Sequence, residues 1–447
     1  MDLMQLDAVI FGGGAAGLWV LDELTRRGNS ALLIEAHALG HGQTVASQGI
    51  IHGGLKYTLA GLFTPAAQQI REMPNVWRSC LAGDAAPDLS RTRVRSPFCY
   101  LWRTDSIGSR LGMIGASIGL RVAPRSLDDT ERPPILDGCP GSVARLDEQV
   151  ISPASFVAEL AARHRDWIVQ ATLDEVEFDT RSAGEVRAVR VREPCDGLLA
   201  PHPRPLSPFG GEERLIDSNS GSLEIRPRCV IFTAGAGNSE LRAQVGLATH
   251  VMQRRPLHMV LLRGELPQFC GHCVDGTTTR VTITSDTDAA GRTIWQVGGQ
   301  LAEDGVAWDR SRLVAHARSE LAVVLPSLDL RRVEFGTYRV DRAEGRTPSG
   351  ARPDSIQILR EGNTITAWPT KLALAPLLAS EIIGRAFLPD ARTNKNVHVT
   401  VDHRTPTDFD PIAWQHWPRP AVAAPPWEVE ANWSLNSDAS SAPARAA

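Results

Sequence analysis

The sequence predicts an α/β fold in which a parallel, dinucleotide-binding sheet is interleaved with a second domain built on a mixed or antiparallel sheet. Residues 7–35 are typical of a strand, a glycine-rich turn, a helix and a second strand. Further along the chain, short apolar segments at residues 256–263, 280–284 and 293–298 are typical of strands in a second sheet.

Each element of the first unit follows from its residue pattern. Residues 8–11 form a continuous apolar run, as in a parallel strand that is buried on both faces. Residues 15–27 carry leucines at helical spacing, and Gly28 ends the helix. Residues 31–34 form a second apolar run, which Glu35 closes. The result is a βαβ unit whose crossover should be right-handed.

The turn between the first strand and the helix matches the pattern G-x-G-x-x-G. Gly12 permits the tight turn, Gly14 lets the backbone approach a pyrophosphate, and Gly17 lets the helix pack against the strand. The helix N-terminus offers N–H groups and a positive dipole end to phosphates. Glu35 lies near the position expected of a ribose-binding acid and would repel a 2′-phosphate, which favours FAD or NAD over NADP. The expected contacts are Gly12, Gly14, Ala15, Ala16, Gly17 and Glu35.

Length and composition are typical of a soluble protein. The 447 residues allow two or three domains, or two that interleave, and 43% of them are hydrophobic. A net charge of −4 gives no overall case for binding nucleic acid or an anionic membrane. Seven scattered cysteines and an N-terminus without a signal-peptide pattern favour a cytoplasmic protein. No apolar run is long enough for a transmembrane helix, while peripheral membrane association stays open.

Residues 46–57 read Ala-Ser-Gln-Gly-Ile-Ile-His-Gly-Gly-Leu-Lys-Tyr. This stretch resembles the D-amino-acid-oxidase-like superfamily of flavoproteins, nearest to FAD-dependent glycerol-3-phosphate dehydrogenase and L-2-hydroxyglutarate dehydrogenase. Weaker similarities follow in the expected order at residues 229–237, 256–260 and 366–372. The resemblance implies FAD as the cofactor and a Rossmann-like FAD-binding domain.

The chain departs from the family pattern at three places. Lys56 stands where the glycerol-3-phosphate branch has arginine, so the charge remains but bidentate phosphate binding is lost. Pro369 and Thr370 replace a Gly-Gly pair before the last helix, and Arg339 and Arg342 compete for one family role. These differences put recognition of a phosphate-bearing substrate in doubt.

Further cofactor contacts are expected outside the glycine-rich turn. Thr44 and Ser47 are candidates for bonds to the pyrophosphate or the flavin edge, although both suit ordinary loop hydroxyls. The backbone of Val176 is a candidate contact for the adenine, and a plain core role is the alternative. Ala234 and Gly235 resemble the turn that closes the FAD domain.

Two histidines are candidates for catalysis. His258 is the first candidate for the general base, since an imidazole titrates near neutral pH; a hydrogen-bonded core histidine is the alternative. His52 is expected to line the substrate pocket or to attach the flavin covalently, and an ordinary loop histidine is the alternative.

Three cations are candidates for the substrate. Arg339 and Arg342 suit a carboxylate or phosphate, and Lys371 suits reduced flavin or substrate. For each, ordinary surface charge is the alternative. The run Cys270-Gly271-His272-Cys273 has flanks that look like a loop, so a redox pair or half of a zinc site is the less favoured alternative, and no metal site is predicted.

The expected organisation is two domains woven from several segments, followed by a tail rich in Pro and Trp. The tail is expected to pack as a strap, and a latch for a partner or membrane is the alternative. The FAD-binding domain is assigned to residues 1–80, 140–245 and 335–400, the substrate domain to 81–139 and 246–334, a flexible insertion to 196–222, and the tail to 401–447.

These observations predict an FAD-dependent oxidoreductase that oxidises a CH–OH group of a small anionic substrate, such as a 2-hydroxy acid or a glycerol-3-phosphate-like polyol. A quinone, another carrier or dioxygen would take the electrons. An amine or amino-acid oxidase, a non-catalytic flavin-binding protein and a plain NAD-dependent dehydrogenase remain as alternatives.

Overall fold

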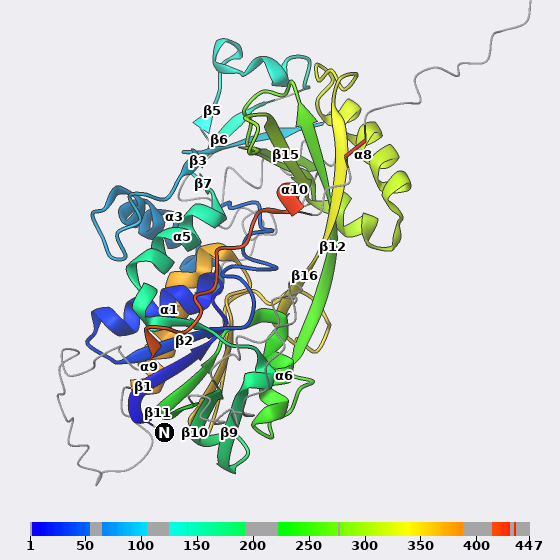
Figure 1. The fold of residues 1–447 in the computed structure, drawn as a ribbon. Helices are drawn as coiled ribbons and strands as arrows, with labels where there is room; N and C mark the ends of the chain where they lie inside the picture. Colours follow the sequence, from blue (N-terminus) through cyan, green and yellow to red (C-terminus); the bar gives the residue numbers. More distant parts are fainter. Residues whose placement is uncertain are drawn as a thin grey trace, which may run out of the picture.

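The structure, a computed structural model, contains two large sheets that lie side by side (Figure 1). Helices flank the first sheet, and the second sheet carries its own helices on its outer side. The structure describes residues 2–53, 65–104, 125–140, 142–192, 222–275, 278–387, 414–429 and 433–434. Most of the expected insertion at 196–222 therefore lies outside the described residues, as does Lys56.

The first sheet has a parallel core, as the apolar runs predict. Its strand order is β17-β18-β11-β1-β2-β8, with β9 and β10 attached to β11. Strand β17 is an antiparallel edge, and β9 and β10 form an antiparallel ribbon. Side chains on both faces of the central strand are fully buried. The bounds are β1 (Asp2–Phe11), β2 (Ala31–Glu35), β8 (Ile168–Gln170), β9 (Val176–Ser182), β10 (Glu185–Arg192), β11 (Ser222–Phe232), β17 (Gln357–Glu361) and β18 (Thr364–Trp368).

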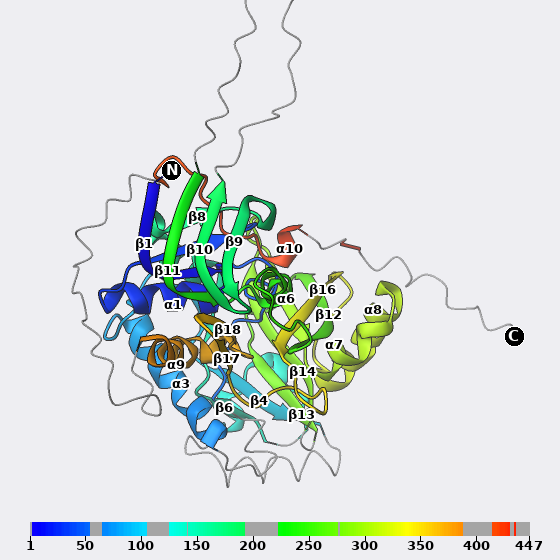
Figure 2. The ribbon, with the colours of Figure 1, turned by 90° about the horizontal axis from the view of Figure 1, so that it is seen from below.

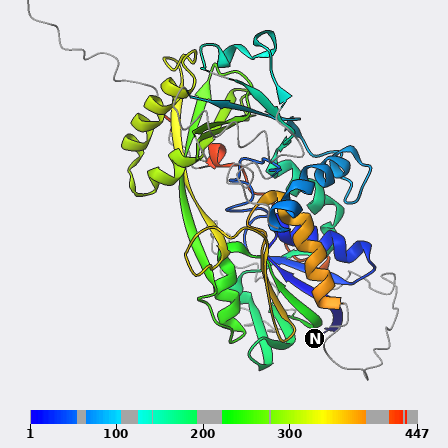
Figure 3. The same cartoon turned by 180° about the vertical axis from the view of Figure 1, so that it is seen from behind.

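Four helices cover one face of this sheet and form a continuous apolar core with it (Figures 1 and 3). They are α1 (Ala15–Arg26), α3 (Pro65–Ala82), α5 (Pro153–Arg163) and α9 (Ala375–Phe387). Helix α5 begins with Ser152 as its cap, and Pro153 occupies its first position, where no N–H is needed.

A buried polar contact joins two of these helices. The carboxylate of Asp22, in α1, lies 2.9 Å from Nε2 of His164 at the end of α5 and accepts a 2.7 Å hydrogen bond from Arg26. Burial by itself would raise the pKa of Asp22, but His164 and Arg26 outweigh it and hold the pKa below its ordinary value. The ionised carboxylate is therefore the form that stabilises the fold.

Asp22→Asn should lower the free energy of unfolding by about 3 kcal/mol at pH 7, because it breaks a buried charged contact. Since the folded-state pKa is depressed, this stabilisation exists above the unfolded pKa of about 3.9 and disappears as the pH falls through the folded value. Thermal melting at pH 7 and pH 3 measures both effects. Asp147→Asn, at a half-exposed ion pair with Arg78, is the control and should change little. An equal difference between wild type and Asp22→Asn at both pH values would contradict the assignment.

The second sheet is mixed, with strand order β16-β12-β15-β14-β13-β4-β6-β5. All neighbours are antiparallel except β13 and β4. Helix α8 packs on its outer face, where Val260 and Leu262 meet Leu313 and Leu321. The bounds are β4 (Cys99–Arg103), β5 (Arg125–Ser126), β6 (Ala144–Leu146), β12 (Met252–Gly264), β13 (Gly271–Asp275), β14 (Thr278–Thr287), β15 (Thr293–Gly298), β16 (Glu334–Gly345), α7 (Gln300–Asp304) and α8 (Arg310–Val324).

The remaining elements are short. Strands β3 and β7 form a separate two-stranded sheet. The bounds are β3 (Val94–Ser96), β7 (Val150–Ile151), α6 (Asn238–Gln244), α10 (Pro426–Val429), and the 3₁₀ helices η1 (Asp129–Glu131), η2 (Pro134–Leu136), η3 (Arg165–Trp167), η4 (Leu173–Glu175), η5 (Gly235–Gly237), η6 (Gly305–Ala307) and η7 (Leu372–Leu374).

Two segments that the sequence assigns to the FAD-binding domain pair within the second sheet instead. Strand β16 runs along the whole of β12, from Glu334 opposite Arg263 to Gly345 opposite Met252. Strand β6 pairs with β4 and β5. The two-domain division itself stays a prediction, but residues 335–345 and 144–146 belong to the sheet of the other domain.

The described part of the tail packs as a strap across the body, next to β8 and the loop after β2 (Figure 2). Leu39 and Ala421 share a backbone hydrogen bond, as do Ala423 and Leu39. Trp414 and Trp417 are buried in the core on the second face of the first sheet. Within the described residues, no helix is long and apolar enough to cross a membrane.

Candidate active site

The glycine-rich turn has the close contacts that its pattern predicts. Gly12 has φ of +102°, and a Cβ there would lie 2.5 Å from Cα of Ala234. A Cβ on Gly17 would lie 1.9 Å from the carbonyl oxygen of Gly12. Only glycine fits at these two positions. The contact with Ala234 also places the Ala234-Gly235 turn directly against the glycine-rich turn.

The residues around this turn fit a dinucleotide. The N-cap residue of α1 is Gly14, which offers no side chain, so the N–H groups of the first turn other than that of Ala15 can meet phosphate oxygens. Oγ1 of Thr44 accepts a 3.2 Å hydrogen bond from the N–H of Ala15. The hydroxyl of Ser47 is buried without a hydrogen-bond partner, as expected of a group that awaits a ligand. FAD would therefore be held by the N–H groups of α1 with Thr44 and Ser47.

Two other predicted cofactor contacts occupy defined places. Glu35 accepts hydrogen bonds from the N–H groups of Gly13 (2.6 Å) and His37 (3.0 Å), which fixes its carboxylate at the end of β2. Val176 begins β9 and packs into the core on the second face of the first sheet. The roles of both residues toward the cofactor stay predictions.

The loop after β2 links the dinucleotide turn to the second sheet. The hydroxyl of Tyr338 donates a 2.8 Å hydrogen bond to the carbonyl of Ala46. The side-chain amide of Gln48 donates to the carbonyls of Thr282 and Gln296, each at 3.0 Å. Residues 46–48 of the loop are thus fixed to the second sheet, four residues before His52.

His52 meets two side chains from distant parts of the chain. Oε2 of Glu148 lies 3.5 Å from Nδ1 of His52 and 3.4 Å from Nε2 of His272. The other carboxylate oxygen accepts a 2.7 Å hydrogen bond from the N–H of Gly53, and Nδ1 of His272 lies 3.0 Å from Oγ1 of Thr282. Glu148 and His272 are buried, whereas 40% of the His52 side chain is exposed. We call these three residues the His-Glu-His cluster.

The surroundings of the cluster shift the pKa values of Glu148 and His52. Burial by itself would raise the pKa of Glu148, but His272 and His52 hold it far below its ordinary value. Burial lowers the pKa of His52. The charges of His272 and Lys371 also lower it, whereas Glu148 raises it without reversing the shift. A neutral His52 beside an ionised Glu148 is therefore the favoured state at neutral pH.

Two members of this cluster, Glu148 and His272, were not among the candidates that the sequence indicated. Glu148 lies between β6 and β7, and no sequence motif marks it. His272 belongs to the Cys-Gly-His-Cys run, and the prediction of a loop directly after that run was wrong, because Val274 and Asp275 continue strand β13 (Gly271–Asp275). Gly271 permits the close pairing with β4, since a Cβ would lie 2.5 Å from the carbonyl oxygen of Tyr100.

The two cysteines of that run do not form a redox pair in the structure. Both are free thiols, and they pack into different apolar clusters. Burial raises the pKa of Cys273 to about 12 and also raises the pKa of Cys270. Neither is a reactive thiolate at neutral pH.

His258 lies in a different environment from His52. It is buried on β12, and its Nδ1 lies 3.1 Å from the carbonyl oxygen of Gly305 in η6. Burial lowers its pKa, and the charge of Arg339 adds to this effect. These contacts match the alternative of a hydrogen-bonded core histidine, and a catalytic role for His258 stays a prediction.

The three predicted cations lie in different surroundings. Arg339 donates to the carbonyls of Val306 and Trp308, next to His258. Arg342 donates a 3.2 Å hydrogen bond to Glu303. Only Lys371 has a charge that acts on His52. Of the three, Lys371 is therefore the cation whose charge reaches the His-Glu-His cluster.

The turn before Lys371 has an unusual backbone. Thr370 has φ of +59°, which is rare for a β-branched residue and is the conformation that glycine adopts most easily. Arg352 donates a 2.9 Å hydrogen bond to the Thr370 carbonyl, and the Thr370 side chain is buried. These contacts fix the backbone from which Lys371 projects.

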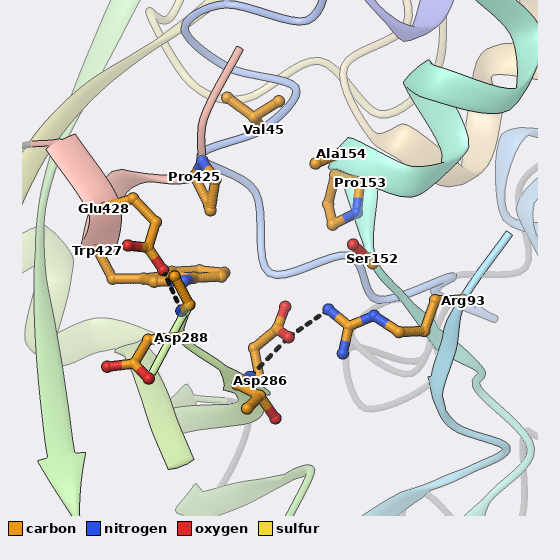
Figure 4. A pocket seen from close by; sticks show the side chains of 12 residues that line it. Val45, Arg93, Ser152, Pro153, Ala154, Asp286, Asp288, Pro425, Trp427 and Glu428 are labelled. Carbon is orange, nitrogen blue, oxygen red and sulfur yellow. Dashed lines mark hydrogen bonds and ion pairs between the residues drawn. The ribbon is translucent and has the colours of Figure 1, made fainter. Parts of the chain in front are cut away.

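A cavity of about 340 Å³ shares no lining residue with this cluster (Figure 4). Its wall includes Trp427 of the strap and Ser152 at the start of α5. Asp286 lies on its floor, paired with Arg93 and with the buried Arg95. These ion pairs are internally satisfied, and we assign the cavity no part in the chemistry.

Comparisons with known proteins identify the family. Residues 7–375 match the DAO family model, described as FAD dependent oxidoreductase. The chain belongs to this family. A probable FAD-dependent oxidoreductase of Pseudomonas aeruginosa is 35% identical over 432 residues, which are 95% of this chain and 98% of the relative. A crystal structure of a P. aeruginosa FAD dependent oxidoreductase has a TM-score of 0.73 at 33% identity and covers 96% of this chain and 99% of its own.

More distant similarities concern shorter regions or the fold alone. Glycerol-3-phosphate dehydrogenase 1 of Mycobacterium tuberculosis is 36% identical over only 56 residues, which are 12% of this chain and 11% of the relative. Glycine oxidase of Geobacillus kaustophilus has a TM-score of 0.58 at 13% identity and covers 88% of this chain and 97% of its own.

These comparisons confirm an FAD-dependent oxidoreductase with the predicted α/β fold. They confirm FAD as the cofactor, so the NAD alternative is wrong. They support the superfamily resemblance, while the similarity to glycerol-3-phosphate dehydrogenase is limited to a short segment.

Proposed function

We propose that this enzyme oxidises a CH–OH group of a small anionic substrate, with His52 as the acceptor of the hydroxyl proton. The observation that carries the proposal is His52 placed beside the buried carboxylate of Glu148, where the charge of Lys371 also acts on it. The proposal gives His52 the role for which the sequence favoured His258.

A hydroxyl group needs a base more than an amine does. An alcohol carries its proton until the carbon is oxidised, so a positioned base lowers the barrier. A neutral amine has a lone pair of its own and can be oxidised without such a base. A carboxylate that orients a histidine and stabilises its protonated form suits an alcohol substrate.

Each residue of the cluster has a separate task in this proposal. The N–H of Gly53 fixes one oxygen of Glu148, and the other oxygen faces Nδ1 of His52. A proton on Nδ1 leaves Nε2 as the base. As His52 takes the hydroxyl proton, the ionised Glu148 stabilises the imidazolium that forms. When bound, FAD accepts the two electrons of the oxidation.

Lys371 supports an anionic substrate. Its charge acts on His52, so a carboxylate or phosphate bound to Lys371 would lie near the base. A lysine binds either anion as a point charge and does not impose the bidentate geometry of arginine. This fits a small 2-hydroxy acid or a polyol phosphate.

Anaerobic reduction of the bound flavin tests the proposal. The FAD-loaded enzyme is mixed with a panel of 2-hydroxy acids and polyol phosphates, and with the amino acids of matching carbon skeleton. We expect the 450 nm flavin band to bleach with at least one hydroxy anion and not with its amino counterpart. Bleaching by amines alone would replace the proposal with an amine oxidase. Bleaching by no member of the panel would favour a non-catalytic flavoprotein.

A further inference from the structure

We propose that the His-Glu-His cluster also binds one divalent cation of the zinc class, and that this cation inhibits the enzyme. The binding site follows from the geometry of His52, Glu148 and His272. The inhibition rests in addition on the proposed function, in which His52 is the base.

The three side chains offer ligand atoms at metal-binding spacing. One nitrogen of each histidine and one carboxylate oxygen all lie within 4.8 Å of one another. Two ligands that are each 2.0–2.1 Å from a tetrahedral zinc ion lie about 3.3–3.4 Å apart. The distances from Glu148 to the two rings, 3.4 and 3.5 Å, match this spacing better than they match strong charge-assisted hydrogen bonds.

Two of these ligand atoms are buried without a hydrogen-bond partner. They are Oε2 of Glu148 and Nε2 of His272, whose side chains are each only 5% exposed. Leaving such atoms unpaired in the interior is costly, and a cation between them would satisfy both at once.

Surrounding groups already orient both buried ligands. Oγ1 of Thr282 lies 3.0 Å from Nδ1 of His272, so a Thr282 hydroxyl that accepts the Nδ1 proton would leave the lone pair of Nε2 available to a cation. The N–H of Gly53 holds the second oxygen of Glu148. Outer-shell contacts of this kind orient histidine and carboxylate ligands in protein zinc sites.

The site is accessible and has a suitable charge. Two neutral imidazoles and one carboxylate are a ligand set that zinc accepts, with a fourth position left for water. His52 is the partly exposed member and gives the cation a way in. The charge of Lys371 opposes the cation, so we expect reversible binding that a chelator removes. A bound zinc ion would draw His52 and Glu148 away from the substrate proton and block the base.

Calorimetric titration of zinc chloride into the chelator-treated, FAD-loaded enzyme tests the site directly. We expect one zinc ion per chain, and a dissociation constant at least tenfold higher in His272→Gln. His258→Gln is the matched control, since His258 is also a buried strand histidine and lies outside the cluster; its zinc affinity should equal that of wild type. If His272→Gln fails to fold, Thr282→Val removes only the outer contact and should weaken binding about 10–100-fold.

The outcomes separate the two proposals. No stoichiometric binding, or binding that neither variant weakens, would overturn the zinc site whatever the enzyme oxidises. Binding that His272→Gln weakens, together with inhibition of turnover that EDTA reverses, would support both parts. Cluster-dependent binding with undiminished turnover would confirm the site but overturn the inhibition and, with it, the role of His52 as base.

Discussion

His52→Gln should lower the rate constant for flavin reduction by about 10²–10⁴-fold, the usual contribution of a positioned general base. Glutamine can still donate an N–H toward Glu148 but has no basic nitrogen for the hydroxyl proton. Flavin content and melting temperature should stay near the wild-type values, because 40% of the His52 side chain is exposed. Anaerobic stopped-flow spectroscopy with the best hydroxy anion measures the effect.

His41→Gln is the control for this variant. His41 is an exposed histidine in the same loop, so its loss should leave the rate constant unchanged. A His52→Gln enzyme that reduces its flavin within threefold of the wild-type rate would contradict the proposed base.

Gly14→Val should abolish retention of FAD, so that the purified variant is colourless. The added side chain would lie at the N-terminus of α1, where a Cβ is already 3.1 Å from Oγ1 of Thr44, and would occupy space needed by the pyrophosphate. The backbone at Gly14 has φ of −79°, which any residue adopts, so the variant should fold. Flavin absorbance per chain after gel filtration is the measurement.

Gly291→Ala separates loss of FAD from loss of stability. Gly291 has φ of +81° and open space around it, so alanine there strains the backbone by about 1–2 kcal/mol without touching the cofactor site. This control should melt at a lower temperature and keep its flavin. A folded Gly14→Val protein with a full complement of FAD would show that the cofactor does not bind at this turn.

Local sequence patterns were sufficient to predict the first βαβ unit. The apolar runs, the helical leucine spacing and the glycine-rich turn all lie within residues 7–35, and the structure reproduces their order and close contacts. The His-Glu-His cluster could not be predicted in this way, because its members come from residues 52, 148 and 272. Pairing of β13 with β4 and β14 brings His272 into place, and such non-local pairing leaves no short-range pattern.

The placement of His258 shows a second limit on what can be predicted from the sequence. Successive side chains of a strand point to opposite faces, so a sequence that predicts the strand does not say which face meets the active site. In β12, His258 faces η6, while Met259 lies beside Gly298 near the side chain of Gln48. The same reason explains why residues 335–345 were assigned to the FAD-binding domain, since the pairing of β16 with β12 depends on the register of two distant segments.

The most direct test of the proposed His52–Glu148 pair is a double-mutant cycle on the rate constant for flavin reduction. The cycle compares wild type, His52→Gln, Glu148→Gln and the double variant with the same hydroxy anion. If Glu148 acts by orienting and stabilising His52, each single variant should be slow and the double variant should be no slower than His52→Gln. Independent, multiplicative losses in the double variant would contradict this account.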